Sequence, residues 1–166
     1  VPRVNPCKFH NGTRACGGFV VFIHKSYRDG EPDLLFFHRM AFFHKSGPAH
    51  GDAYAKLVST AIAVGSVVAL RGNGYLSQAL KESVRLAGIS LQKIASTDGD
   101  FADATFVSVV NPCDDDIFEA DVSGTATQAN VGKQYDLTQV AAGTAQSVDL
   151  ASQTYKVVTV VKFLTA

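Results

Sequence analysis

The chain has 166 residues, of which 46% are hydrophobic and 18% are charged, and its formal net charge at pH 7 is zero. This composition excludes a disordered polypeptide, and the length suits one domain with a substantial core. The longest apolar runs, at 19–23 and 34–37, are far shorter than the ~20 residues that a membrane-spanning helix needs, so we expect no membrane partner.

Charge is spread unevenly along the chain. Residues 1–50 carry seven Lys/Arg and three Asp/Glu, whereas residues 51–166 carry eight and twelve, and all five His lie in the first part. This asymmetry predicts an N-terminal extension or arm over 1–60 and a β domain over 61–166. Two interpretations of 1–39 stay open, because the only methionine is Met40: these residues belong to the working domain, or they are an upstream extension.

The N-terminal part predicts little regular structure. Residues 18–25 and 33–39 are apolar enough to be strands, and the Asp-Gly turn chemistry between them favours a hairpin. Residues 41–55 are polar and contain Gly and Pro, which indicates an extended arm.

Regular strand patterns begin after residue 61. Residues 62–70 and 75–79 flank an Arg-Gly-Asn-Gly turn, which predicts a hairpin. A strand is expected over 84–91, with Gly88 as a bulge or a point of close backbone approach. A loop at 96–103 precedes a strand at 105–110.

The stretch 114–137 shows the strictest alternation in the chain. Ile117, Glu119 and Asp121 fall on one side, and Phe118, Ala120 and Val122 on the other. A second extended run follows at 131–137, a short strand at 148–150, and a final strand at 155–164 whose β-branched residues suit a central position. These elements predict an all-β fold, a small barrel or sandwich with an extended N-terminal arm.

Candidate metal and catalytic residues lack the spacing that their chemistry needs. The set Cys7, His10, Cys16 and His24 has one close pair and one loose pair, whereas structural zinc sites usually have two close pairs. The acidic runs 114–116 and 98–103 offer oxygen atoms to a cation, but solvated turns are the simpler interpretation. No spacing supports Cys113 as a nucleophile with His44 or His50. We therefore expect no cofactor, no metal and no enzymatic activity.

A basic and aromatic segment near residue 40 is the best candidate for a contact surface. Cations and stacking rings are what nucleic acid needs, but the repeated Phe-Phe-His is more typical of an apolar patch that meets a protein. The sequence therefore predicts protein binding and no nucleic-acid binding, through four residues: Phe42, Phe43, His44 and Lys45.

Five stretches together resemble the head-decoration, or capsid-cementing, proteins of tailed bacteriophages and related small virion proteins. They are 63–70, 85–90, 117–127, 131–137 and 156–164, and the fourth contains a G-x-x-Y-D-L turn motif. The resemblance covers roughly the last two-thirds of the chain and rests on patterns of low specificity.

The resemblance implies an all-β accessory protein that binds an assembled capsid from outside and reinforces it without chemistry. Its partners would be the major capsid protein and copies of itself, commonly as a trimer, on a particle assembled in the host cytoplasm. The arm at 41–55 would add main-chain hydrogen bonds to an exposed sheet edge. The alternatives are a sugar- or cation-binding barrel that uses the acidic loops, a hydrolase that uses Cys113, and a tail or head-fibre component.

Overall fold

The structure, a computed structural model, describes residues 19–24, 42–47, 50–83, 85–112, 116–138 and 140–164, with only the backbone for 19–24, 45–46 and 163–164. Its elements are β1 (Phe19–His24), β2 (Phe42–Ser46), β3 (His50–Ala55), β4 (Val67–Leu70), β5 (Leu76–Gln78), β6 (Leu86–Ser90), β7 (Phe106–Asn111), β8 (Ile117–Ser123), a 3-10 helix η1 (Gln128–Asn130), β9 (Gln134–Leu137), β10 (Val148–Asp149) and β11 (Val158–Leu164).

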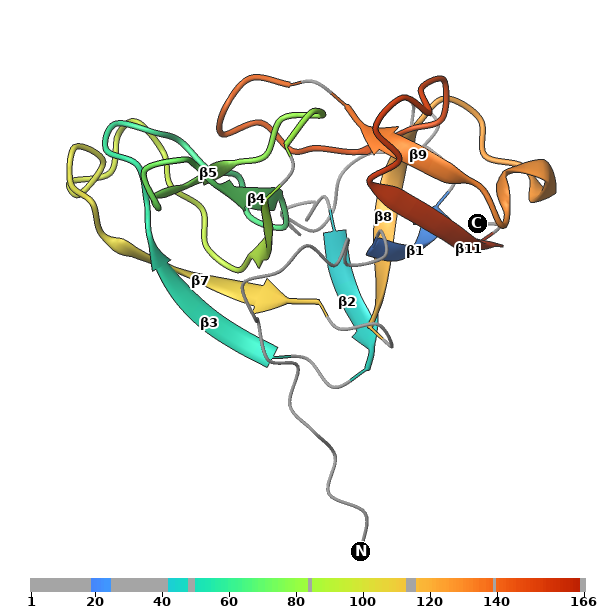
Figure 1. Ribbon diagram of the computed structural model, residues 1–166, viewed down its shortest axis with the longest axis horizontal. Coiled ribbons are helices and arrows are strands. Elements are labelled where there is room, and N and C mark those ends of the chain that lie inside the picture. The colour runs from blue at the N-terminus through green and yellow to red at the C-terminus, as the bar shows by residue number, and fades with distance from the viewer. Residues whose placement is uncertain are drawn as a thin grey trace, which may run out of the picture.

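The strands form two sheets that stand side by side in Figure 1, the five-stranded one on the left and the six-stranded one on the right. The five-stranded sheet is antiparallel and has the order β3-β7-β6-β4-β5. The six-stranded sheet is mixed, with the order β1-β11-β9-β10-β8-β2 and a further parallel pairing of β1 with β8. The all-β prediction is therefore confirmed, and in the described part of the chain the fold is sandwich-like rather than a closed barrel.

The buried apolar residues form two clusters, one on each face of the five-stranded sheet. The larger cluster lies between the two sheets and takes Val67, Ile89 and Val110 from the five-stranded sheet. The smaller cluster lies on the other face of that sheet and includes Val68, Val107 and Val109. Because neighbouring strand residues point to opposite faces, the five-stranded sheet is apolar on both sides.

Several strand predictions are confirmed. The hairpin β4–β5 has the expected turn, with Gly74 at φ 82°, but its first strand begins at Val67 rather than at residue 62. Strand β4 begins later than predicted and follows a turn in which Gly65 has φ 71°. In β8 the residues Phe118, Ala120 and Val122 are buried and Asp121 is exposed, as the alternation predicts. Strand β11 lies between β1 and β9, inside its sheet.

Strands β2 and β3 belong to the segment 1–60 that was predicted as an extension or arm. Both are extended, as expected for 41–55, and each pairs with a strand from beyond residue 60: β2 with β8, and β3 with β7. The prediction of a strand at 18–25 is confirmed by β1, which pairs in parallel with β8 and β11. Its hairpin partner at 33–39 falls outside the described residues.

Candidate functional site

The predicted contact residues Phe42 and Phe43 lie on opposite faces of β2. The Phe42 side chain is 1% exposed within the cluster between the sheets, and its N–H donates to Gly65 O at 3.0 Å. Phe42 is therefore a core residue, and its prediction as a surface anchor is wrong. Phe43 is 51% exposed and points outward, because side chains alternate along a strand.

His44 connects β2 to the residue that precedes β8. Its Nε2 lies 3.1 Å from Oδ1 of Asp116, whose side chain is fully buried. The imidazole also meets the Phe118 ring edge-on, with centroids 5.3 Å apart. His44 therefore helps to hold β2 in place. The side chain of Lys45 lies outside what the structure describes.

Strand β3 is the margin of the five-stranded sheet and has one neighbour, β7, among the described strands (Figure 1). Residues His50–Ala53 are exposed. Just after β3, Lys56 forms an isolated β-bridge with Leu76, and the N–H of Leu57 donates to Leu76 O at 2.8 Å. The end of β3 therefore meets β5. Before that point, Ala53 N–H donates at 2.8 Å to the Asp52 carboxylate of its own strand. This bond blunts the edge without covering it.

On one face of β3, Tyr54 belongs to a small cluster of polar side chains. The Asn111 amide approaches the Tyr54 hydroxyl at 3.5 Å. Burial raises the pKa of Tyr54 above its usual value, and the carboxylate of Asp52 raises it further against the opposing effect of Asn111. The Tyr54 hydroxyl therefore stays protonated at neutral pH and remains a hydrogen-bond donor.

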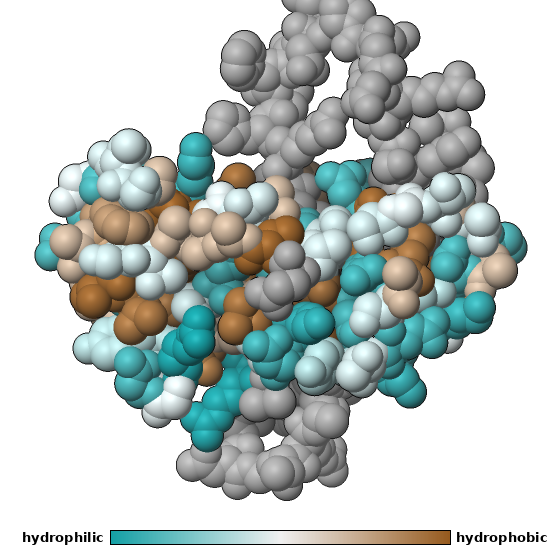
Figure 2. Space-filling model, turned by 90° about the horizontal axis from the view of Figure 1, so that it is seen from above, coloured by the Kyte–Doolittle hydropathy of each residue, from teal (hydrophilic) through white to brown (hydrophobic). Residues whose placement is uncertain are grey.

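The other face of β3 continues an apolar surface that the second sheet leaves uncovered. Along β7, Val110 is 8% exposed between the sheets, whereas Phe106, four residues earlier on the same face, is 70% exposed. We call this surface the uncovered face and define it by Ala53, Ala55, Leu91 and Phe106. Figure 2 views the molecule from above, away from β3 at the bottom of Figure 1, and shows that further hydrophobic residues reach the surface over the half that holds the five-stranded sheet.

The acidic loop at 98–103 is organised by internal bonds. The Asp98 carboxylate accepts the N–H of Ala95 at 2.7 Å, and that of Asp100 accepts the Thr105 hydroxyl at 3.0 Å. The fully buried ammonium of Lys56 donates to the carbonyls of Phe101 and Asp103. A lysine cation therefore already uses carbonyl oxygens that an ion would need.

The remaining predicted ligands come together nowhere in the described residues. No group of three or more His, Cys, Asp or Glu side chains within the described ranges could hold a metal ion. Asp116 pairs with His44, while Asp114 and Asp115 lie outside the described part. The same holds for Cys7, His10, Cys16 and Cys113, and only the backbone of His24 is described.

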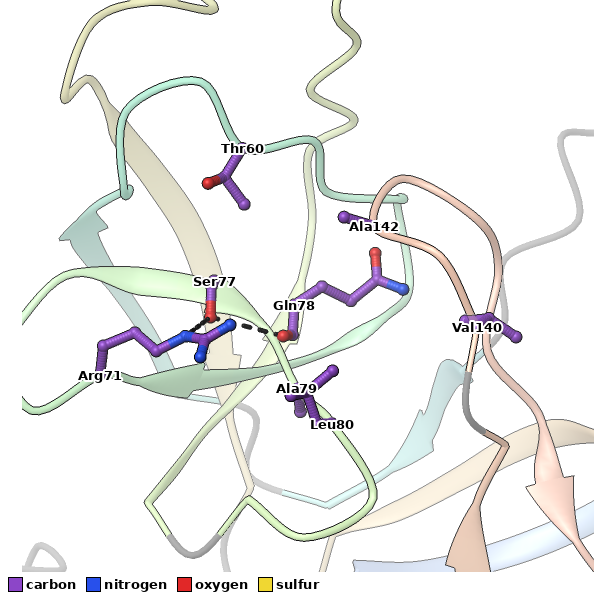
Figure 3. Close-up of a pocket in the computed structure, with 8 residues that line it drawn as sticks. All are labelled: Thr60, Arg71, Ser77, Gln78, Ala79, Leu80, Val140 and Ala142. Carbon is purple, nitrogen blue, oxygen red and sulfur yellow. Dashed lines mark hydrogen bonds between the residues drawn. The ribbon is translucent and has the colours of Figure 1, made fainter.

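Figure 3 shows a hollow where the β4–β5 hairpin meets the loop around residue 142. Its volume is about 50 Å³, room for one or two waters and well below the ~300 Å³ of the smallest usual ligand pockets. Gln78 fills part of the interface, since its side chain bonds Ala63, Gly143 and Thr144. The hollow is a packing seam between loop and hairpin.

Asp136 is the residue that the motif analysis left without a role. It is fully buried and accepts hydrogen bonds from the Ser152 hydroxyl and from the N–H groups of Thr154, Tyr155 and Lys156, at 2.6–2.9 Å. Burial would raise the pKa of Asp136, but these bonds outweigh it and the pKa lies below its usual value. The G-x-x-Y-D-L motif thus fastens the loop that leads into β11.

No known protein family, curated protein or solved structure matches the chain. Among the described helices, none has the length and apolar character to pass through a membrane.

Proposed function

We propose that the chain is a structural protein of a virion that binds the outer surface of an assembled capsid and stabilises it. The observation that carries the proposal is the segment from β2 to β3, which combines the half-exposed ring of Phe43 with a sheet margin of exposed residues. Main-chain groups at a sheet margin and an aromatic anchor are what binding by strand addition requires.

Three further features support a contact function. The hollow of Figure 3 is too small for an organic ligand, and the acidic loop at 98–103 is engaged by Lys56. The uncovered face adds apolar area next to the same margin. Many copies docked on one shell would turn weak single contacts into durable attachment. The resemblance to head-decoration proteins points to the same class of partner.

Co-sedimentation tests this proposal. Purified chain is mixed with capsids assembled from the major capsid protein of the same virus, and the pellet is analysed for bound chain. We expect binding by wild type and a loss of about tenfold or more in affinity for Phe43→Asp, which places a charge in the contact. Tyr75→Asp is the matched control, because Tyr75 is 39% exposed on the β4–β5 turn and neither of these strands pairs with β2. Wild type that stays in the supernatant would refute the proposal.

A further inference from the structure

The margin formed by β3 is complementary to itself. We propose that two copies of this chain associate through β3, each strand pairing antiparallel with its counterpart about a two-fold axis at Ala53. This association would extend the five-stranded sheet into a continuous sheet across the dimer. Because the dimer uses the outward main-chain groups of β3, it competes with strand addition to a capsid at this margin, and Phe43 on β2 stays available for a capsid contact.

The hydrogen-bond pattern within the sheet decides which groups β3 offers. Ser108 of β7 accepts the N–H of Leu91 and so faces β6, which leaves Val107 and Val109 to face β3. Their partners are Tyr54 and Asp52. Because bonding directions alternate along an antiparallel strand, the intervening residues Gly51, Ala53 and Ala55 direct their N–H and C=O groups away from the sheet.

One register of the strand pair satisfies these outward groups. With Ala53 opposite Ala53 of the second copy, Gly51 lies opposite Ala55 on both sides, and about six main-chain hydrogen bonds form. Sliding the pair one way places Asp52 opposite Asp52, which like charges disfavour. Sliding it the other way requires Leu57, whose N–H is already committed to Leu76 O.

The side chains fit the same register. Asp52 lies opposite Tyr54 of the second copy, twice by symmetry, so each protonated hydroxyl, which already lies near the Asp52 carboxylate of its own chain, meets a second carboxylate across the axis. When the two copies pair, the Ala53 N–H leaves the Asp52 carboxylate of its own chain and donates to the second copy instead. Among the described residues, no atom lies within 4 Å of a Cβ built on Gly51, so none of them obstructs the neighbouring copy there. The exposed Phe106 ring stands beside Ala55 and faces the second copy's Gly51, which has no side chain in its way.

Sedimentation velocity of the full chain over a wide concentration range tests the association. We expect a concentration-dependent species of twice the 17.6 kDa chain mass. Ala53→Pro removes two of the bridging N–H donors and none that β7 uses, so the dissociation constant should rise about tenfold or more. The matched control is Ala142→Pro, at the second position of the 141–144 turn, where proline is favoured. A monomer at every concentration, or a trimer, would overturn the proposal.

A single cysteine tests the register itself and does not depend on how the proline variant folds. In a background with Cys7, Cys16 and Cys113 changed to Ser, Ala53→Cys places two thiols across the two-fold axis, at the ~5.5 Å Cα separation that a disulfide spans. Mild oxidation should link this variant into a covalent dimer and leave the exposed control Ala142→Cys monomeric. Equal linkage of both variants, or of neither, would show that β3 does not pair as proposed.

Discussion

Asp136 contributes to the stability of this fold through hydrogen bonds that its buried carboxylate accepts from four donors. Asp136→Asn would turn an amide N–H₂ toward those donors. We expect the free energy of unfolding, measured by urea denaturation at pH 7, to fall by about 3 kcal/mol. Asp121→Asn, at an exposed position of β8, should change it by less than about 0.5 kcal/mol.

The lowered pKa of Asp136 gives this loss a pH dependence. A carboxylate whose folded pKa is lowered adds stability that is complete above its unfolded pKa of about 4 and disappears as the pH falls through the folded value. The difference in unfolding free energy between wild type and Asp136→Asn should therefore be constant at neutral pH and shrink below about pH 4. A difference that grows on acidification would contradict the assignment.

Phe42 and Phe43 are adjacent but differ in function: Phe42 packs in the core, and Phe43 is the proposed contact residue. Phe42→Ala removes a ring from the cluster between the sheets and should cost about 3–5 kcal/mol of unfolding free energy. Phe43→Ala changes a half-exposed ring and should cost about 1 kcal/mol or less. Chemical denaturation of the two variants measures both values, and equal costs would show that Phe43 also belongs to the core.

At the scale of elements, Gly88 fixes the approach of β6 to β7. It has φ +148°, and a Cβ built there would lie 2.1 Å from Val110 O and 2.6 Å from Val109 Cγ1. Gly88→Ala should therefore destabilise the protein by about 3 kcal/mol or more, seen as a lower melting temperature in circular dichroism. Gly72→Ala, where nothing lies within 4 Å, is the matched control and should melt close to wild type.

Sequence patterns predicted those elements in which the order of the residues depends directly on which side chains are buried or on a local turn. Period-two alternation located β8, turn chemistry located the β4–β5 hairpin, and a glycine inside a strand pattern located the close approach at Gly88. Parallel pairing of β1 with β8 joins segments nearly a hundred residues apart and has no local signature. The burial of Phe42 could not be predicted either, because two adjacent phenylalanines do not show which of them faces the core.

The polar contacts escaped prediction for a related reason. Lys56, Asp136 and Asp116 look like solvated charges in the sequence, yet each is buried and bonded to a partner far along the chain. Burial of a charge is decided by tertiary placement and is tolerated only where hydrogen bonds compensate it. A carboxylate within an otherwise apolar run, as in Tyr-Asp-Leu at 135–137, was the available hint.

At the scale of the whole molecule, the two sheets share one core, and among the described strands β3 forms a margin of exposed residues beside an apolar face. Such an arrangement suits a protein that works by contact, since strand margins bind other chains. We propose that this margin and the neighbouring β2 attach the chain to a capsid.

Electron cryomicroscopy of capsids incubated with the purified chain tests this claim most directly. We expect added density on the outside of the shell, repeated with the capsid lattice, with β2 and β3 at the contact. Capsids that gain no density, or density joined to the shell through the β9–β11 side with β2 and β3 facing solvent, would contradict it.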